Sequence, residues 1–109
     1  MISIIIPCRN EERFISKCID SVLAQDYPND RLEVLFLDGQ SGDRTKEIIQ
    51  DYAKNHKHIR LLDNPRKTVP YALNEGIKEA AGEIIIRLDA HALYPPDYVS
   101  KCVKYLNAL

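Results

Sequence analysis

The chain has 109 residues, of which 45% are hydrophobic and 28% are charged, and its formal net charge at pH 7 is −1. This length and composition indicate one globular domain. Because the net charge is close to zero and the basic residues are scattered, the sequence offers no broad basic surface for nucleic acid or an anionic membrane.

The three cysteines, Cys8, Cys18 and Cys102, are odd in number and do not stand at metal-ligand spacing. They therefore predict no disulfide framework and favour a reducing, cytoplasmic compartment. The apolar residues 2–6 are too few to span a bilayer and lack the features of a signal peptide, so we expect no transmembrane segment. The sequence stops at Leu109, directly after an amphipathic pattern, and we expect it to be part of a longer protein.

Apolar runs alternate with helical stripes along the chain. The runs predict strands, and the stripes, with apolar residues three and four apart, predict helices. The predicted strands cover residues 2–6, 32–37, 59–62 and 83–88, and the predicted helices cover residues 14–23, 48–53, 69–80 and 98–106. Asn10 is the expected N-cap of the first helix, and Gly82 is the expected stop of the third. The alternation predicts an α/β fold, a Rossmann-like parallel sheet of about four strands with flanking helices.

Polar side chains follow every predicted strand, at the edge of a parallel sheet where ligands bind. The residues singled out at these ends are Arg9 and Glu11, with the neighbouring Pro7, after the first strand, Asp38 after the second, Asp63, Asn64, Arg66 and Lys67 after the third, and Asp89 and His91 after the fourth. Some of them have a purely structural interpretation, such as a turn-stabilising acid or a solvated basic pair. Together, acids, cations and an imidazole at one edge predict a site for a metal-bound diphosphate.

Asp89 and His91 are the candidate metal ligands. In an extended backbone, residues two apart point the same way, so both side chains can reach one small target. Taken alone, the pair could also be a capped turn followed by a solvated histidine. Mg²⁺ and Mn²⁺ prefer oxygen ligands, and a histidine shifts the preference toward Mn²⁺ or another transition ion. Such an ion would stabilise the charge on a departing diphosphate.

Other nucleotide-binding signatures are missing. The turn after the first strand, Pro7-Cys8-Arg9-Asn10-Glu11, is neither G-x-G-x-x-G nor a P-loop, which argues against dehydrogenases and P-loop NTPases. Cys8 has no histidine nearby in the sequence that would activate it as a nucleophile.

Three segments of the chain resemble the family 2 glycosyltransferases of the GT-A fold. They are residues 4–11 (IIIPCRNE), 37–45 (LDGQSGDRT) and 88–91 (LDAH), which occur in the family's order and spacing. Within this family, the chain resembles the bacterial exopolysaccharide transferases of the succinoglycan type. The resemblance implies that residues 1–109 form the nucleotide-sugar-binding part of a GT-A domain, ending before the acceptor half.

The resemblance also implies roles for single residues. Pro7, Arg9 and Glu11 would lie against the uridine, Asp38 would lie near the base and ribose, and Asn74 with Gly76 matches an N-x-G signature. Arg66 and Lys67 remain candidates for binding the nucleotide-sugar. Asp89 and His91 occupy the D-x-D positions, where the first residue reaches ribose or sugar and the last holds the metal. Two departures are Gly39, where many relatives carry a second acid, and His91, which replaces an acid and leaves the metal preference open.

The implied activity is transfer of a sugar from a UDP-sugar to an acceptor hydroxyl, assisted by Mn²⁺ or Mg²⁺ and with inversion. The expected role is polysaccharide or cell-surface glycan biosynthesis in bacteria, with a glycan or lipid-linked acceptor. The full-length protein would act in the cytoplasm or at the inner face of the membrane. The catalytic base is expected beyond Leu109, so we expect this chain alone to bind donor with little or no transfer. The alternative is a non-catalytic nucleotide-binding or signalling module.

Overall fold

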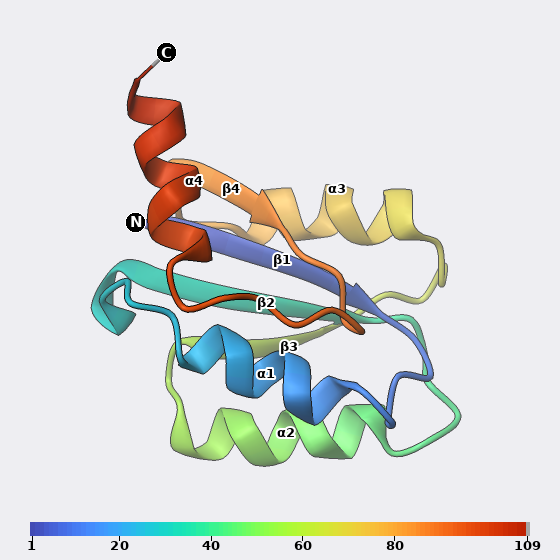
Figure 1. The fold of residues 1–109 in the computed structure, drawn as a ribbon. Coiled ribbons are helices and arrows are strands. Elements are labelled where there is room, and N and C mark those ends of the chain that lie inside the picture. Colours follow the sequence, from blue (N-terminus) through green and yellow to red (C-terminus); the bar gives the residue numbers. More distant parts are fainter. Residues whose placement is uncertain (109) are drawn as a thin grey trace.

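The computed structural model describes residues 1–108 and shows four parallel strands with flanking helices (Figure 1). The strand order in the sheet is β3-β2-β1-β4. The strands are β1 (Ile2–Cys8), β2 (Leu32–Asp38), β3 (Ile59–Asp63) and β4 (Ile84–Arg87). The helices are α1 (Ile15–Leu23), α2 (Thr45–Asn55), α3 (Val69–Glu79) and α4 (Tyr98–Asn107), with a 3₁₀ turn at Asn29–Arg31. The predicted fold class is confirmed.

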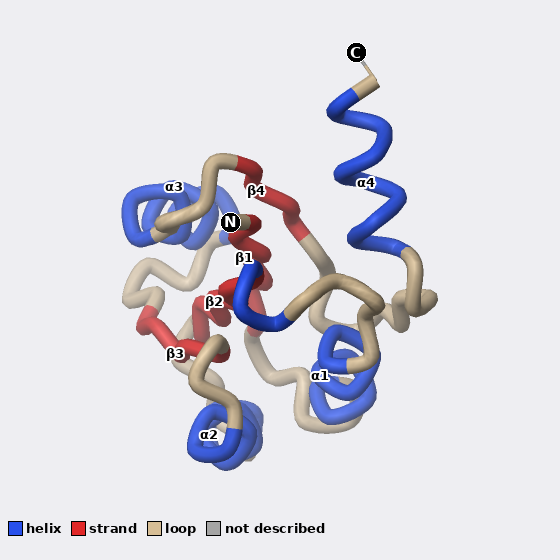
Figure 2. The backbone as a smooth tube through the Cα atoms, turned by 90° about the vertical axis from the view of Figure 1, so that its left-hand side faces the viewer, coloured by secondary structure: helices blue, strands red, loops and turns tan. Residues whose placement is uncertain are grey.

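Helices cover both faces of the sheet, as Figure 2 shows. On one face, Ile4, Ile6 and Phe36 pack in a large core with residues of α1, α2 and the start of α4. On the other face, Ile5, Leu35 and Leu37 pack against α3. Both faces of β1 and β2 are therefore buried, which explains their continuous apolar runs. Within residues 1–108, no helix has the length and apolar character needed to cross a membrane.

The strand register brings the carboxyl ends of the strands to one level. Cys8 of β1 pairs with Asp38 of β2, which in turn pairs with Asp63 of β3. Arg87 of β4 pairs with Ile5, so two further residues bring Asp89 to the level of the β1 end. The loops that carry the predicted site therefore meet at one edge of the sheet.

Two predicted helix boundaries are wrong. The helix after β1 begins at Ile15, and the turn before it is closed by hydrogen bonds from the N–H groups of Phe14 and Ile15 to the Glu11 carbonyl. Asn10 is no N-cap: its φ is 55°, and its Oδ1 accepts a hydrogen bond from Gly42 N at 2.8 Å.

Gly82 does not end α3, whose last residue is Glu79 and whose C-cap is Ala80. Glycine is required at position 82 for space, since a Cβ there would lie 2.5 Å from Ser3 Oγ and 2.7 Å from Ser3 N.

Candidate functional site

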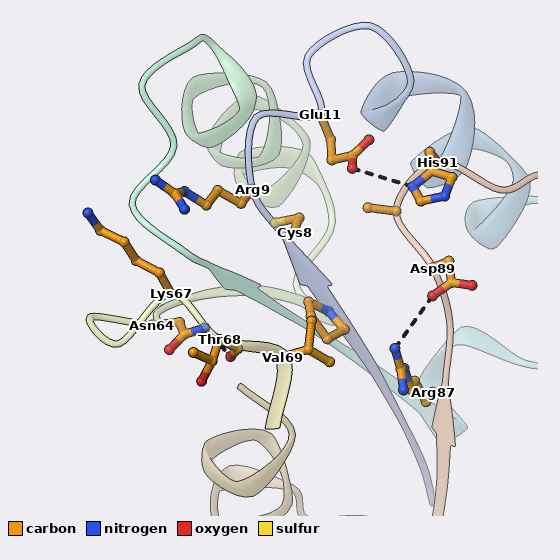
Figure 3. Close-up of a pocket in the computed structure, with 12 residues that line it drawn as sticks. Cys8, Arg9, Glu11, Asn64, Lys67, Thr68, Val69, Arg87, Asp89 and His91 are labelled. Carbon is orange, nitrogen blue, oxygen red and sulfur yellow. Dashed lines mark hydrogen bonds and ion pairs between the residues drawn. The ribbon is translucent and has the colours of Figure 1, made fainter. Parts of the chain in front are cut away.

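A cavity of about 300 Å³ opens at the carboxyl edge of the sheet (Figure 3). Its walls come from the end of β1, the loop between β3 and α3, and the segment after β4. Six of the residues predicted for the site line it: Pro7, Arg9, Glu11, Lys67, Asp89 and His91. The structure thus brings together residues from three separate loops.

The segment from Asp89 to Tyr94 is folded back on itself. The Tyr94 hydroxyl accepts a hydrogen bond from Asp89 N at 2.7 Å and donates one to Asp89 O at 3.4 Å. The Cys18 thiol of α1 donates to the same carbonyl at 3.5 Å. The backbone of Asp89 is therefore held from two sides. Its side chain is 60% exposed, and one carboxylate oxygen lies 3.8 Å from the Arg87 guanidinium.

His91 faces a carboxylate from another part of the chain. Its Nδ1 lies 3.4 Å from Glu11 Oε1, and Figure 3 shows this pair beside the cavity. Glu11 comes from the loop after β1, and its N–H donates a hydrogen bond to Thr45 Oγ1 at 2.8 Å. One side of the cavity therefore carries two carboxylates, from Glu11 and Asp89, and the imidazole of His91.

The cations Arg9 and Lys67 lie on the opposite side of the cavity (Figure 3). Both are exposed, and neither forms an ion pair with any residue between 1 and 108. Gly39 lies between them: a Cβ there would be 3.4 Å from both Arg9 Cβ and Lys67 Cα. Position 39 thus holds no side chain that could neutralise these cations. They are available to an anionic ligand.

Backbone strain is concentrated at this edge. Asn10, Gln40 and Lys67 are the non-glycine residues with positive φ in the described part of the chain, at 55°, 58° and 64°. They lie in the loops after β1, β2 and β3 respectively. Left-handed conformations are uncommon for glutamine and lysine, and such strain tends to cluster at functional sites.

Three of the predicted binding residues do not line the cavity. Asp38 is buried, with one oxygen accepting from Ser41 Oγ at 2.5 Å and the other from Ser41 N at 3.2 Å. Its carboxylate stabilises the turn after β2, and it borders a separate hollow near α2. The Arg66 guanidinium stacks over the ring of Tyr71 at 4.9 Å, and Asn74 is exposed on α3.

Asn64, which the sequence places at this edge without a binding role of its own, also lines the cavity. Its Nδ2 donates to the Thr68 carbonyl at 2.9 Å, and its own carbonyl accepts from Lys67 N at 3.1 Å. The buried Asn64 Oδ1 has no hydrogen-bond partner in the described residues. Asn64 shapes the loop that presents Lys67, and the Asn-Pro sequence at 64–65 is the turn signal that could have indicated it.

The cysteine beside the cavity is unsuited to nucleophilic chemistry. Burial raises the pKa of the Cys8 thiol far above its usual range, and the charges of Asp38 and Glu11 raise it further. A thiol that stays protonated is a poor nucleophile. This agrees with the absence of an activating histidine near Cys8 in the sequence.

The donor set suits a divalent cation that is shared with a phosphate ligand. No three metal-ligating side chains among residues 1–108 lie close enough to hold a metal ion by themselves. Asp89 and His91 offer one carboxylate and one imidazole on the same cavity. Mg²⁺ and Mn²⁺ sites in nucleotide enzymes commonly have one or two protein ligands, completed by substrate phosphates and water. The two residues fit such a site.

Comparison with known proteins adds a family match. The model of the family "Glycosyl transferase family 2" matches residues 3–109. A dolichyl N-acetyl-α-D-glucosaminyl phosphate diacetamido-dideoxy-glucuronosyltransferase of Methanococcus voltae is 40% identical over 94% of the chain and 33% of its own length. The succinoglycan biosynthesis protein ExoA of Rhizobium meliloti is 35% identical over 93% of the chain and 31% of its own length. The chain thus spans about a third of these relatives.

Solved structures share the fold. The mannosyltransferase PcManGT from Pyrobaculum calidifontis, in complex with GDP-Man and Mn²⁺, superposes with a TM-score of 0.90. It is 35% identical, and the match covers 96% of this chain and 32% of that one. TarS of S. aureus, at 23% identity and a TM-score of 0.87, covers 98% of this chain and 32% of its own, and supports the fold alone.

Proposed function

The chain belongs to glycosyl transferase family 2, and from this premise we propose that it forms the donor-binding part of a metal-dependent glycosyltransferase. Its donor is a nucleotide diphosphate sugar, which we take to be a UDP-sugar. The observation that carries the proposal is the arrangement around one cavity. Arg9 and Lys67, which have no ion pair within residues 1–108, lie on one side, and Asp89 with His91 lies on the other. Such an arrangement suits a diphosphate that carries a divalent cation.

Different residues of the cavity bind different parts of the donor. Asp89 and His91 hold the divalent cation, and Lys67 attracts the negative charge of the diphosphate. Arg9, which the family resemblance places against the uridine, is here assigned to the diphosphate as well, because it lies on the same side of the cavity as Lys67. Pro7 and Glu11, from the turn after β1, border the nucleoside. A bound cation supplies Lewis-acid stabilisation of the charge that develops on the diphosphate as it departs.

In the reaction, the acceptor hydroxyl oxygen attacks the anomeric carbon, and the bond from that carbon to the diphosphate oxygen breaks with inversion. A base must take the hydroxyl proton, and we assign that role to no residue of this chain. Asp97 lies at the start of α4 and pairs with Lys101 at 3.0 Å. Glu83 precedes β4, where its N–H bonds to the Met1 carbonyl at the opposite end of the sheet.

The comparisons support the donor class and the biological role. PcManGT, in complex with GDP-Man and Mn²⁺, supports a nucleotide diphosphate sugar together with a divalent metal. Relatives that include a poly-β-1,6-N-acetyl-D-glucosamine synthase of Staphylococcus epidermidis, 39% identical over 88% of this chain and 23% of its own length, support polysaccharide synthesis. We propose a glycan or lipid-linked acceptor, and action at the cytoplasmic face of the membrane.

Isothermal titration of the chain with UDP, with and without Mn²⁺, tests the proposal. UDP should bind more tightly with Mn²⁺, and His91→Ala should weaken that binding by about tenfold or more, as loss of metal ligation does. His58→Ala is the matched control, because this histidine lies before β3, away from the cavity. If the affinity for UDP were unchanged by Mn²⁺ and by His91→Ala, the metal site would be contradicted. Tighter binding of GDP than of UDP would overturn the choice of UDP as the nucleotide of the donor.

A further inference from the structure

Hydrogen bonds fix the backbone of Glu11. Its side chain lies beside His91, which belongs to the irregular segment after β4. The Glu11 N–H donates to Thr45 Oγ1, and its carbonyl accepts from the N–H groups of Phe14 and Ile15 at 2.9 and 2.8 Å. Thr45 is itself buried and bonded through its hydroxyl to Asp43 Oδ1 at 2.6 Å. The position of the Glu11 backbone is thus determined by α1 and α2, independently of the segment after β4.

The side chains of this pair differ in their exposure to solvent. The Glu11 side chain is 22% exposed, whereas that of His91 is 63% exposed. His91 Nδ1 lies 3.4 Å from Glu11 Oε1, and its other ring nitrogen, Nε2, has no partner among the described residues. The neighbouring Asp89 carboxylate does not compete for the imidazole, since its ion-pair partner is Arg87. Glu11 is therefore the carboxylate that forms an ion-pair contact with the His91 ring.

We propose that Glu11 is a positioning residue, whose carboxylate holds His91 in the Nδ1–H tautomer with Nε2 free to bind the divalent cation. The inference rests on the proposed function and extends it. In a neutral imidazole one nitrogen carries the proton and the other is the lone-pair donor, so a proton held at Nδ1 by the nearby Glu11 carboxylate leaves Nε2 as the metal ligand. Carboxylates that accept from metal-binding histidines do this in many metal sites.

The competing explanation is an ordinary surface ion pair. Such pairs contribute little and leave the histidine free to change tautomer. The two explanations differ in an observable that stability does not report, namely which ring nitrogen of His91 carries the proton when no ligand is present.

Long-range ¹⁵N–¹H NMR correlation of the histidine rings at pH 8.5 measures this directly, with His91→Ala assigning the signals. His91 should show the Nδ1–H pattern in the wild type and in Glu11→Gln, whose amide oxygen still accepts a hydrogen bond. Glu11→Ala should change it toward Nε2–H. Glu12→Ala is the matched control, because it removes an exposed carboxylate from the next position of the same loop. An Nε2–H pattern in the wild type, or no change in Glu11→Ala, would overturn the proposal.

The link to the metal is measured by titrating Mn²⁺ in the presence of UDP and following the free ion by electron paramagnetic resonance. Glu11→Ala should weaken Mn²⁺ binding by about 10- to 100-fold, the usual effect of losing such a partner, and Glu11→Gln should restore most of it. A changed tautomer with unchanged Mn²⁺ affinity would overturn the positioning role. Failure of the wild type to bind Mn²⁺ with UDP would overturn the proposed function, whereas the ligand-free NMR experiment decides the Glu11–His91 contact separately.

Discussion

Replacing Gly76 with alanine tests how closely α3 packs on the sheet. A Cβ at position 76 would lie 2.8 Å from Ile5 Cγ2, 2.9 Å from Ile5 Cδ1 and 3.2 Å from Ile5 Cγ1. Ile5 cannot withdraw easily, because it is fully buried in the core between β1, β2 and α3 and its β-branched side chain is stiff. The glycine of the N-x-G signature therefore has a packing role in this chain.

Two opposing effects determine how Gly76→Ala changes the free energy of unfolding. Alanine in place of glycine inside a helix gains about 1 kcal/mol of helix propensity. Overpacking a buried site costs about 1–3 kcal/mol, and two contacts below 3.0 Å place this site at the upper end. We expect Gly76→Ala to lower the free energy of unfolding by about 1–2 kcal/mol, which corresponds to about 4–9 °C in Tm for a domain of this size.

Urea unfolding followed by far-UV circular dichroism measures the change. Asn74→Ala is the control, because this exposed residue of the same helix gains propensity without a clash and should stabilise by about 0.5 kcal/mol. Ile5→Val removes the Cδ1 contact and should reduce the penalty of Gly76→Ala. Stabilisation by Gly76→Ala equal to that of Asn74→Ala would refute the close contact with Ile5.

Two further predictions concern the segment after β4 and its neighbour in α1. Tyr94→Phe leaves Asp89 N without its partner, so it should cost about 1 kcal/mol in urea unfolding and weaken UDP binding with Mn²⁺ in calorimetry. Burial, and then the charges of Asp89 and Glu11, raise the pKa of the Cys18 thiol to about 12, so little thiolate exists at pH 8. In Cys102→Ser, iodoacetamide should label no cysteine of the native chain and label the remaining thiols in urea, as mass spectrometry would show.

Much of the site could be predicted because parallel strands end at one edge. The positions of Arg9, Lys67, Asp89 and His91 followed from that rule and from the order of the strands. The rule gives no side-chain directions, however. It could not separate Lys67, which lines the cavity, from Arg66, which stacks on Tyr71.

The sequence by itself determined the α/β class, the four strands and the family, because these depend on local periodicity and on motifs that are contiguous in the chain. Only the tertiary structure decided which partner each polar group takes. Asn10 bonds to the Gly42 turn instead of capping α1, and Asp38 is engaged by Ser41. Glu11 meets His91 on one side of the cavity because strand order, a long-range property, places the loops after β1 and β4 side by side.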